Sequence, residues 1–220
     1  MALTKFNFNS FDLTTAASKG LAFNSSANGF ETAAEGSMTL IKTLTASSSS
    51  TLSFVHGSSD VVLDSTYPIY VFKFINIHPA TDNTEFQFNG SDDDSSHSYD
   101  VTKTTTFYRA YHDEGDSGTA LEYQTGKDLA QGTGFQRLQN FAASNNDDCC
   151  VGTLHLFDPS NTTFVKHFLS TFNSVSYTST PYSIEAFVAG YGNTTSAVDA
   201  IQFKFESGTF DGTIKLYGVT

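Results

Sequence analysis

Alternation of apolar and polar residues with a period of two is the feature that most constrains the fold of this 220-residue chain. Ile201–Phe205 reads I-Q-F-K-F and Thr213–Tyr217 reads T-I-K-L-Y, so apolar side chains occupy every second position. Successive side chains of a β-strand point to opposite faces of a sheet, so this spacing predicts half-buried strands. The predicted buried face of this terminal hairpin consists of Ile201, Phe203, Phe205, Ile214 and Leu216.

The same pattern along the chain predicts an all-β fold: a two-sheet antiparallel β-sandwich, jelly-roll-like, with about ten strands in a single domain, 1–220. Tyr70–Ile77 is apolar on both faces, which predicts a central strand covered on both sides. Very little helix is expected, confined to short turns at Thr133–Phe141 and Thr14–Leu21. The other expected strands are Lys5–Phe11, Met38–Leu44, Leu52–Val55, Thr84–Phe88, Thr105–Tyr111, Gly152–Phe157, Thr163–Leu169 and Tyr182–Ala189.

The formal net charge of −12 argues against nucleic acid and anionic membranes as partners. Only 15% of residues are charged, whereas Ser and Thr number 27 and 29, which suits a hydroxyl-rich sheet surface. No apolar run is long enough to span a bilayer, and the start MALTKFNFNSFD lacks the apolar region of a signal peptide. The adjacent Cys149 and Cys150 do not form a disulfide framework, so we expect synthesis in a reducing cytoplasm.

Gly115–Gly118 reads GDSG, the sequence around the nucleophile of chymotrypsin-like serine proteases. That chemistry needs a histidine base and a buried aspartate upstream of the serine. Neither upstream histidine lies in the sequence context of a protease base: His56 lies in Phe-Val-His-Gly, and His78 precedes a proline. About half of the chain also follows Ser117, whereas the protease fold places its nucleophile late in the chain. We therefore predict that Ser117 is not a nucleophile and that the motif is a polar turn.

Two acidic stretches, Asp92–Asp94 and Asp113–Asp116, contain the oxygen ligands that Ca²⁺ prefers. Neither has the alternating spacing of an EF-hand loop, so a solvated loop is favoured and bound Ca²⁺ stays an open alternative. The six histidines form no close ligand pair, and His155 and His167 are expected on strand faces. No nucleotide-binding glycine motif is present, so no cofactor and no metal site is predicted.

Tyr108 and Tyr111, with Arg109 and His112 beside them, could form an aromatic platform for a sugar. The favoured interpretation is instead that alternate residues of this strand pack in the core. A pair of catalytic carboxylates from distant strands is also conceivable, because the chain has seven glutamates, but no pattern marks such a pair. The sequence therefore predicts no catalytic, cofactor-binding or metal-binding residue.

The C-terminal segment from Ala197 contains I-x-F-x-F-x-S-G-x-F-x-G-T-I-K-L-Y-G and resembles the closing hairpin of small jelly-roll virion proteins of tailed bacteriophages, especially marine ones. The opening MALTKFNFNSFD and the middle YVFKFINIHP resemble the same proteins, so the likeness spans the chain. It implies a virion structural or accessory protein with a β-sandwich domain, and it brings no catalytic residues.

These observations favour a non-enzymatic virion protein that decorates or cements a capsid surface after assembly in the host cytoplasm. Its expected partners are the major capsid protein or tail and baseplate components, and copies of itself. The alternative is a tail or baseplate module that binds host-surface glycans. A polysaccharide hydrolase is the third reading, and the sequence does not decide between a head and a tail location.

Overall fold

The computed structural model describes residues 21–23, 26, 30–32, 37–177 and 180–220. The chain forms two compact units, Met1–Thr39 and Leu40–Thr220. In the first, β1 (Leu21–Phe23) pairs antiparallel with β2 (Phe30–Thr32). The expected strand Lys5–Phe11 and almost all of the expected turn Thr14–Leu21 lie outside the described residues, and the single domain over 1–220 stays a prediction.

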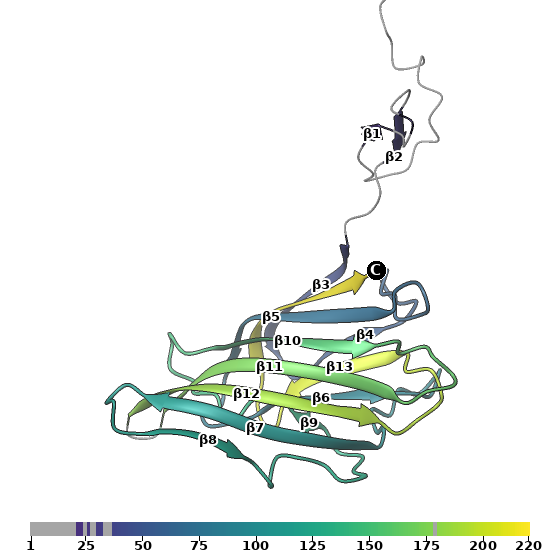
Figure 1. Cartoon of the computed structure of the whole chain (residues 1–220). Coiled ribbons are helices and arrows are strands. Elements are labelled where there is room, and N and C mark those ends of the chain that lie inside the picture. The colour runs from purple at the N-terminus through teal and green to yellow at the C-terminus, as the bar shows by residue number, and fades with distance from the viewer. Residues whose placement is uncertain (1–20, 24–25, 27–29, 33–36, 178–179) are drawn as a thin grey trace, which may run out of the picture. The chain divides into compact units, whose positions relative to one another are not determined.

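Two antiparallel sheets account for the second unit, and no helix occurs in the described residues. The larger sheet contains, in spatial order, β3 (Met38–Ser49), β14 (Phe210–Val219), β5 (Ile69–Pro79), β10 (Cys150–Phe157), β11 (Lys166–Tyr177), β12 (Pro181–Gly192), β7 (Lys103–Asp113) and β8 (Thr119–Tyr123). The smaller sheet contains β4 (Leu52–Val55), β13 (Ala200–Phe205), β6 (Phe86–Ser91) and β9 (Gln136–Arg137). Figure 1 shows six neighbouring strands of the larger sheet side by side, in the order β5, β10, β11, β12, β7 and β8, with the smaller sheet packed against one face. The predicted β-sandwich is confirmed.

Phenylalanine rings fill the space between the two sheets. Phe203 of β13 lies 5.1 Å from Phe72 and 5.0 Å from Phe74 of β5, measured between ring centroids. Phe54 and Phe86 of the smaller sheet also pack on the Phe203 ring. Edge-to-face contacts dominate this cluster, which is the arrangement that aromatic quadrupoles prefer. The core is thus built from the aromatic residues in which the chain is rich.

The terminal segment corrects one prediction. The five predicted core side chains of β13 and β14 are all buried, but the two strands do not form a hairpin. β13 pairs with β4 and β6 in the smaller sheet, whereas β14 pairs with β5 in the larger one. Ser207–Thr209 therefore crosses between sheets, and the two apolar faces meet across the core. Alternation determines which face is buried, but it says nothing of which strands pair.

Strand β5 is central in its sheet, as predicted, but only one of its faces is fully covered. Ile75 is 39% exposed, whereas Ile77, two residues later, is fully buried. Asn76 has a positive φ of 51°, and the β14 register shifts opposite it between Asp211 and Thr213. This bulge inverts the alternation, because one extra residue turns Ile77 towards the core.

The expected helical turn at Thr133–Phe141 is also wrong. Gln136–Arg137 forms β9, which pairs with β6, and the Leu138 amide donates to the Phe86 carbonyl at 2.8 Å. The buried Gln136 side chain accepts from Thr105 and donates to the Lys127 and Arg137 carbonyls. Backbone pairing to a distant strand thus replaces the local helical hydrogen bonds that the spacing of Phe135 and Leu138 suggested.

Strand β11 extends eight residues beyond the predicted Thr163–Leu169, to Tyr177. Its inward positions carry Ser170, Ser174 and Ser176, which interrupts the apolar pattern. Two of these hydroxyls are satisfied by backbone: Ser170 donates to the Thr153 carbonyl and Ser174 to the Phe141 carbonyl. Buried serines with such partners are compatible with a core-facing strand.

Candidate functional site

The alternative of a Tyr108–Tyr111 platform is wrong, because the two side chains lie on opposite faces of β7. Tyr111 and Arg109 share one face, where the guanidinium lies 5.0 Å from the Tyr111 ring centroid and pairs with Glu122. Tyr108 points to the other face, away from the smaller sheet, and is 41% exposed. Alternate residues of the strand do pack inward, as the favoured interpretation has it, with Thr105 and Phe107 buried, but Tyr108 is not among them. A spacing of three residues cannot place two strand residues on one face.

Tyr108 instead stacks on Phe187, its cross-strand partner on β12. The ring centroids are 4.9 Å apart and the planes differ by 11°. Tyr123 of β8 is the partner of Tyr108 on its other side, and Thr171 of β11 is the partner of Phe187. A row of aromatic and hydroxyl side chains therefore crosses the outer face of the larger sheet.

A groove follows the strands from this row. Its first part, a hollow of about 340 Å³, lies beside Tyr108 and Phe187. Its second part, a hollow of about 650 Å³, shares Leu169 and Ala189 with the first. We call these two hollows the outer-face groove; its principal lining residues are Tyr108, Thr153, Thr171 and Phe187 in the first hollow, Leu169 and Ala189 in both, and Thr104, Thr106, His167 and Tyr191 in the second.

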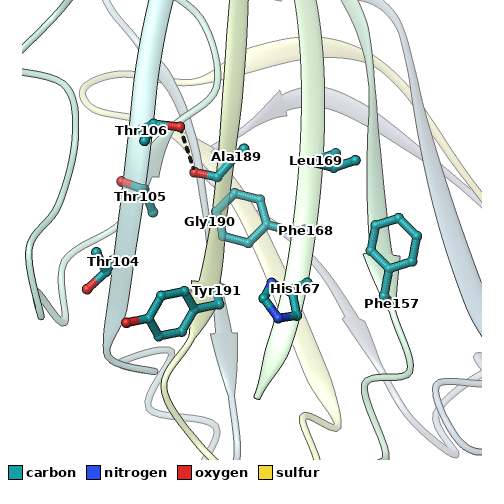
Figure 2. A pocket seen from close by; sticks show the side chains of 10 residues that line it. All are labelled: Thr104, Thr105, Thr106, Phe157, His167, Phe168, Leu169, Ala189, Gly190 and Tyr191. Atoms are coloured by element: carbon teal, nitrogen blue, oxygen red, sulfur yellow. Dashed lines mark hydrogen bonds between the residues drawn. The ribbon is translucent and has the colours of Figure 1, made fainter. Parts of the chain in front are cut away.

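Side-chain size explains why the sheet is hollowed here. Ala189 forms the floor, and the Thr106 hydroxyl donates to its carbonyl at 3.4 Å (Figure 2). Larger rings bound this floor: the Tyr108–Phe187 stack at one end, and Tyr191 beside His167 at the other. Figure 2 shows Tyr191 and His167 side by side on neighbouring strands. A small residue between large ones on adjacent strands leaves a trough that neighbouring side chains do not fill.

The groove continues into a third hollow of about 510 Å³ at the β10–β11 loop, which shares Phe157 and His167 with the second. Phe164, 69% exposed, lies at this end. From Thr171 to Val165 the β11 side spans six residues, or about 20 Å at the rise of a strand. The three hollows together suit an extended ligand better than a compact one.

Among the described residues that line the outer-face groove, none is Asp, Glu, Lys or Arg. The polar groups there are threonine hydroxyls, the Tyr108 and Tyr191 phenols and the imidazoles of His155 and His167. The expectation that both histidines lie on strand faces is confirmed. In a chain of net charge −12, this neutral strip is a local property of the outer face.

The GDSG motif forms the β7–β8 turn around Asp113. The Asp113 carboxylate accepts from the Ser117 and Gly118 amides and from the Ser117 hydroxyl, at 2.5 Å. These hydrogen bonds hold the pKa of Asp113 below its usual value, and the bond from the Ser117 hydroxyl contributes most. His112, the nearest histidine in sequence, pairs with the exposed Asp116. The residues thus build a turn, as the polar-turn interpretation predicts.

A fluorophosphonate probe is therefore expected to leave Ser117 unlabelled. The hydroxyl donates to a carboxylate, whereas a nucleophilic serine needs a base that accepts its proton during attack. Intact-protein mass spectrometry after incubation with the probe measures this. Labelling that disappears in Ser117→Ala but persists in Ser183→Ala, an exposed serine of β12, would contradict it.

Serine hydroxyls surround Asp93 in the first acidic stretch. Ser91, Ser96 and Ser98 all donate to its carboxylate, and these bonds lower its pKa well below the usual range. Asp92 accepts from Thr194 instead. Across the described residues, no three His, Cys, Asp or Glu side chains converge into a set that could hold a metal ion.

Sequence reasoning also misses buried charged residues, among them Glu85, Lys103 and Lys166. Glu85, 1% exposed, pairs with Lys127 and Arg137, which ties the segment before β9 to the smaller sheet. Lys103 is fully buried, and its ammonium donates to the Asn89 side chain and the Val101 carbonyl, at 2.6 Å to the latter. Burial lowers the pKa of Lys103 to about 7. Glu85 meets its partners across 42 and 52 positions, and Lys103 reaches Asn89 across 14, so no local motif marks these contacts.

No family model matches the chain, and neither the curated proteins nor the solved structures include a significant match. The described part of the chain has no helix with the length and apolar character to cross a membrane.

Proposed function

We propose that the chain is a non-enzymatic structural or accessory protein of a phage virion, and that it decorates or cements the capsid surface. The resemblance of its N-terminal, middle and C-terminal segments to phage jelly-roll proteins supports this assignment. The structural observation that carries it is the pair of edges of the larger sheet, β3 and β8. An edge strand presents unpaired backbone groups that another chain can pair with.

Both edges also carry exposed apolar side chains. Leu40 on β3 is 50% exposed, and Leu121 on β8 is 73% exposed. Lysine is the usual residue that blocks edge pairing, and the only lysine on β3 is Lys42, whose ammonium donates to the Ser59 carbonyl. Several modest contacts of this kind, repeated on a symmetric particle, would hold the protein in place.

Mass spectrometry of purified virions tests the proposal: the protein should co-purify with the major capsid protein at a fixed ratio. Leu121→Lys places a charge on the β8 edge and is expected to reduce its copy number, with Thr106→Lys on the outer face as the matched control. Cryo-EM of intact particles places it on the head or the tail. Virions that lack the protein would refute the proposal.

The second candidate function, a glycan-binding module of the tail or baseplate, is favoured by the outer-face groove. Aromatic rings flanked by hydroxyl and imidazole groups are the side chains that bind sugars. Density on the tail, rather than on the capsid, would favour this candidate over a decoration protein.

A further inference from the structure

We propose that the outer-face groove is a binding site for an extended, uncharged glycan, with the Tyr108–Phe187 stack as the platform for one sugar ring. This inference rests on the groove itself and holds whether the protein sits on a head or a tail. It specifies an extended, uncharged glycan, and it pairs Tyr108 with Phe187 in place of Tyr111.

The aromatic stack provides the apolar half of the site. A sugar ring has a face of C–H groups, which packs on an aromatic ring, while its hydroxyls point outward from the rim. Phe187 holds the Tyr108 ring nearly parallel to its own, at 4.9 Å, so the platform is already formed without ligand. A preformed platform lowers the entropic cost of binding, because the side chains do not have to be ordered.

The rest of the groove provides the polar half. Thr153 and Thr171 lie within hydrogen-bond distance of each other, 3.3 Å between hydroxyl oxygens, and they line the first hollow beside the stack. Thr104, His167 and Tyr191 offer donors and acceptors in the second hollow. Groups that both donate and accept suit hydroxyl ligands, which do the same.

Charge selects a neutral glycan over an anionic one. The lining lacks Lys and Arg, and the chain as a whole carries −12. Lys73 of β5 lies opposite Thr153, but its ammonium is placed over the Tyr217 ring, 5.4 Å from the centroid. The third hollow contains one charged residue, Asp158, whose carboxylate accepts from the Asn161 amide at 2.7 Å. An acidic polysaccharide would find no Lys or Arg in the lining and one carboxylate, Asp158, in the third hollow.

The same charge argues against a second copy of the chain as the occupant. Two copies facing each other would bring together two molecules of charge −12, with no basic residue in the groove to offset the repulsion. A protein partner would also have to satisfy the hydroxyl and imidazole groups of the lining, which a glycan matches directly. An extended glycan further accounts for the linear continuation of the groove towards Phe164.

Isothermal titration calorimetry of the full chain with neutral hexasaccharides tests the proposal. The probes are the hexasaccharides of maltose, cellobiose, laminaribiose, mannobiose and N-acetylchitobiose type, with a heparin hexasaccharide as the anionic comparison. At least one neutral probe should bind in a one-to-one complex, and the heparin probe should not. Binding is also expected to change tyrosine fluorescence, which is free of tryptophan background because the chain has none.

Variants then locate the site. Tyr108→Ala is expected to weaken binding at least tenfold, and Ala189→Phe, which fills the floor, should abolish it. Ile75→Ala, on β5 and outside the groove, is the matched control and should bind like the unchanged chain. Thermal melts of all three variants separate lost binding from lost folding.

Three results would overturn the inference: no neutral probe binds, the heparin probe alone binds, or Ile75→Ala weakens binding as much as Tyr108→Ala. Self-association that Ala189→Phe abolishes, without glycan binding, would instead make the groove an interface between copies. None of these results bears on whether the protein is present in virions. Its absence from virions would refute the proposed function and leave the glycan site standing.

Discussion

Replacing Phe203 by alanine is expected to lower the free energy of unfolding by about 3–5 kcal/mol. The ring is fully buried and packs against five other phenylalanine rings contributed by both sheets. Its removal leaves a cavity that strands pinned by backbone hydrogen bonds cannot close. Urea unfolding followed by far-UV circular dichroism measures the loss.

Phe164→Ala is the matched control, because it deletes the same ring from a site that is 69% exposed. Its effect on the free energy of unfolding should stay within about 0.5 kcal/mol. Equal losses in the two variants would show that Phe203 does not join the two sheets.

Stability is expected to rise with pH between about pH 7 and pH 9, and Lys103 should account for much of the rise. Its pKa is about 7 in the folded chain, because burial disfavours the charged form, against 10.5 in the unfolded chain. Between these values the unfolded chain binds more protons than the folded one, so raising the pH favours folding. The full difference between these two pKa values corresponds to roughly 4–5 kcal/mol in the free energy of unfolding.

Urea unfolding at several pH values between 6 and 9.5 measures this slope, with Lys103→Met as the comparison. Burial also lowers the pKa values of Lys127 and Lys166. The Lys103→Met variant should therefore retain part of the increase in stability with pH. The difference between the two proteins therefore isolates Lys103. Above about pH 9 a term of opposite sign sets in, because burial raises the pKa of the Cys150 thiol and the folded chain then holds the extra proton. Above pH 10 Tyr70 acts in the same direction, because burial raises its pKa to about 12. Identical slopes in the two proteins would contradict the prediction.

The candidate site shows where reasoning from the sequence stops. Tyr108 was recognisable as a candidate, since it is an aromatic residue in a strand with polar neighbours. Its true partner, Phe187, lies 79 positions further along the chain and meets it through the β7–β12 register. Register depends on how whole strands align, so no local pattern around Tyr108 could identify that partner.

The alternation of apolar and polar residues determined by itself that the chain is a β-sandwich, and that Ile201, Phe203 and Phe205 are buried. This follows because side-chain direction along a strand is a local property of the backbone. Only the tertiary structure decided that β13 and β14 lie in opposite sheets, that a bulge at Asn76 turns Ile77 inward, and that the groove forms around Ala189. These features depend on contacts between distant strands, whose free energies no single segment contains.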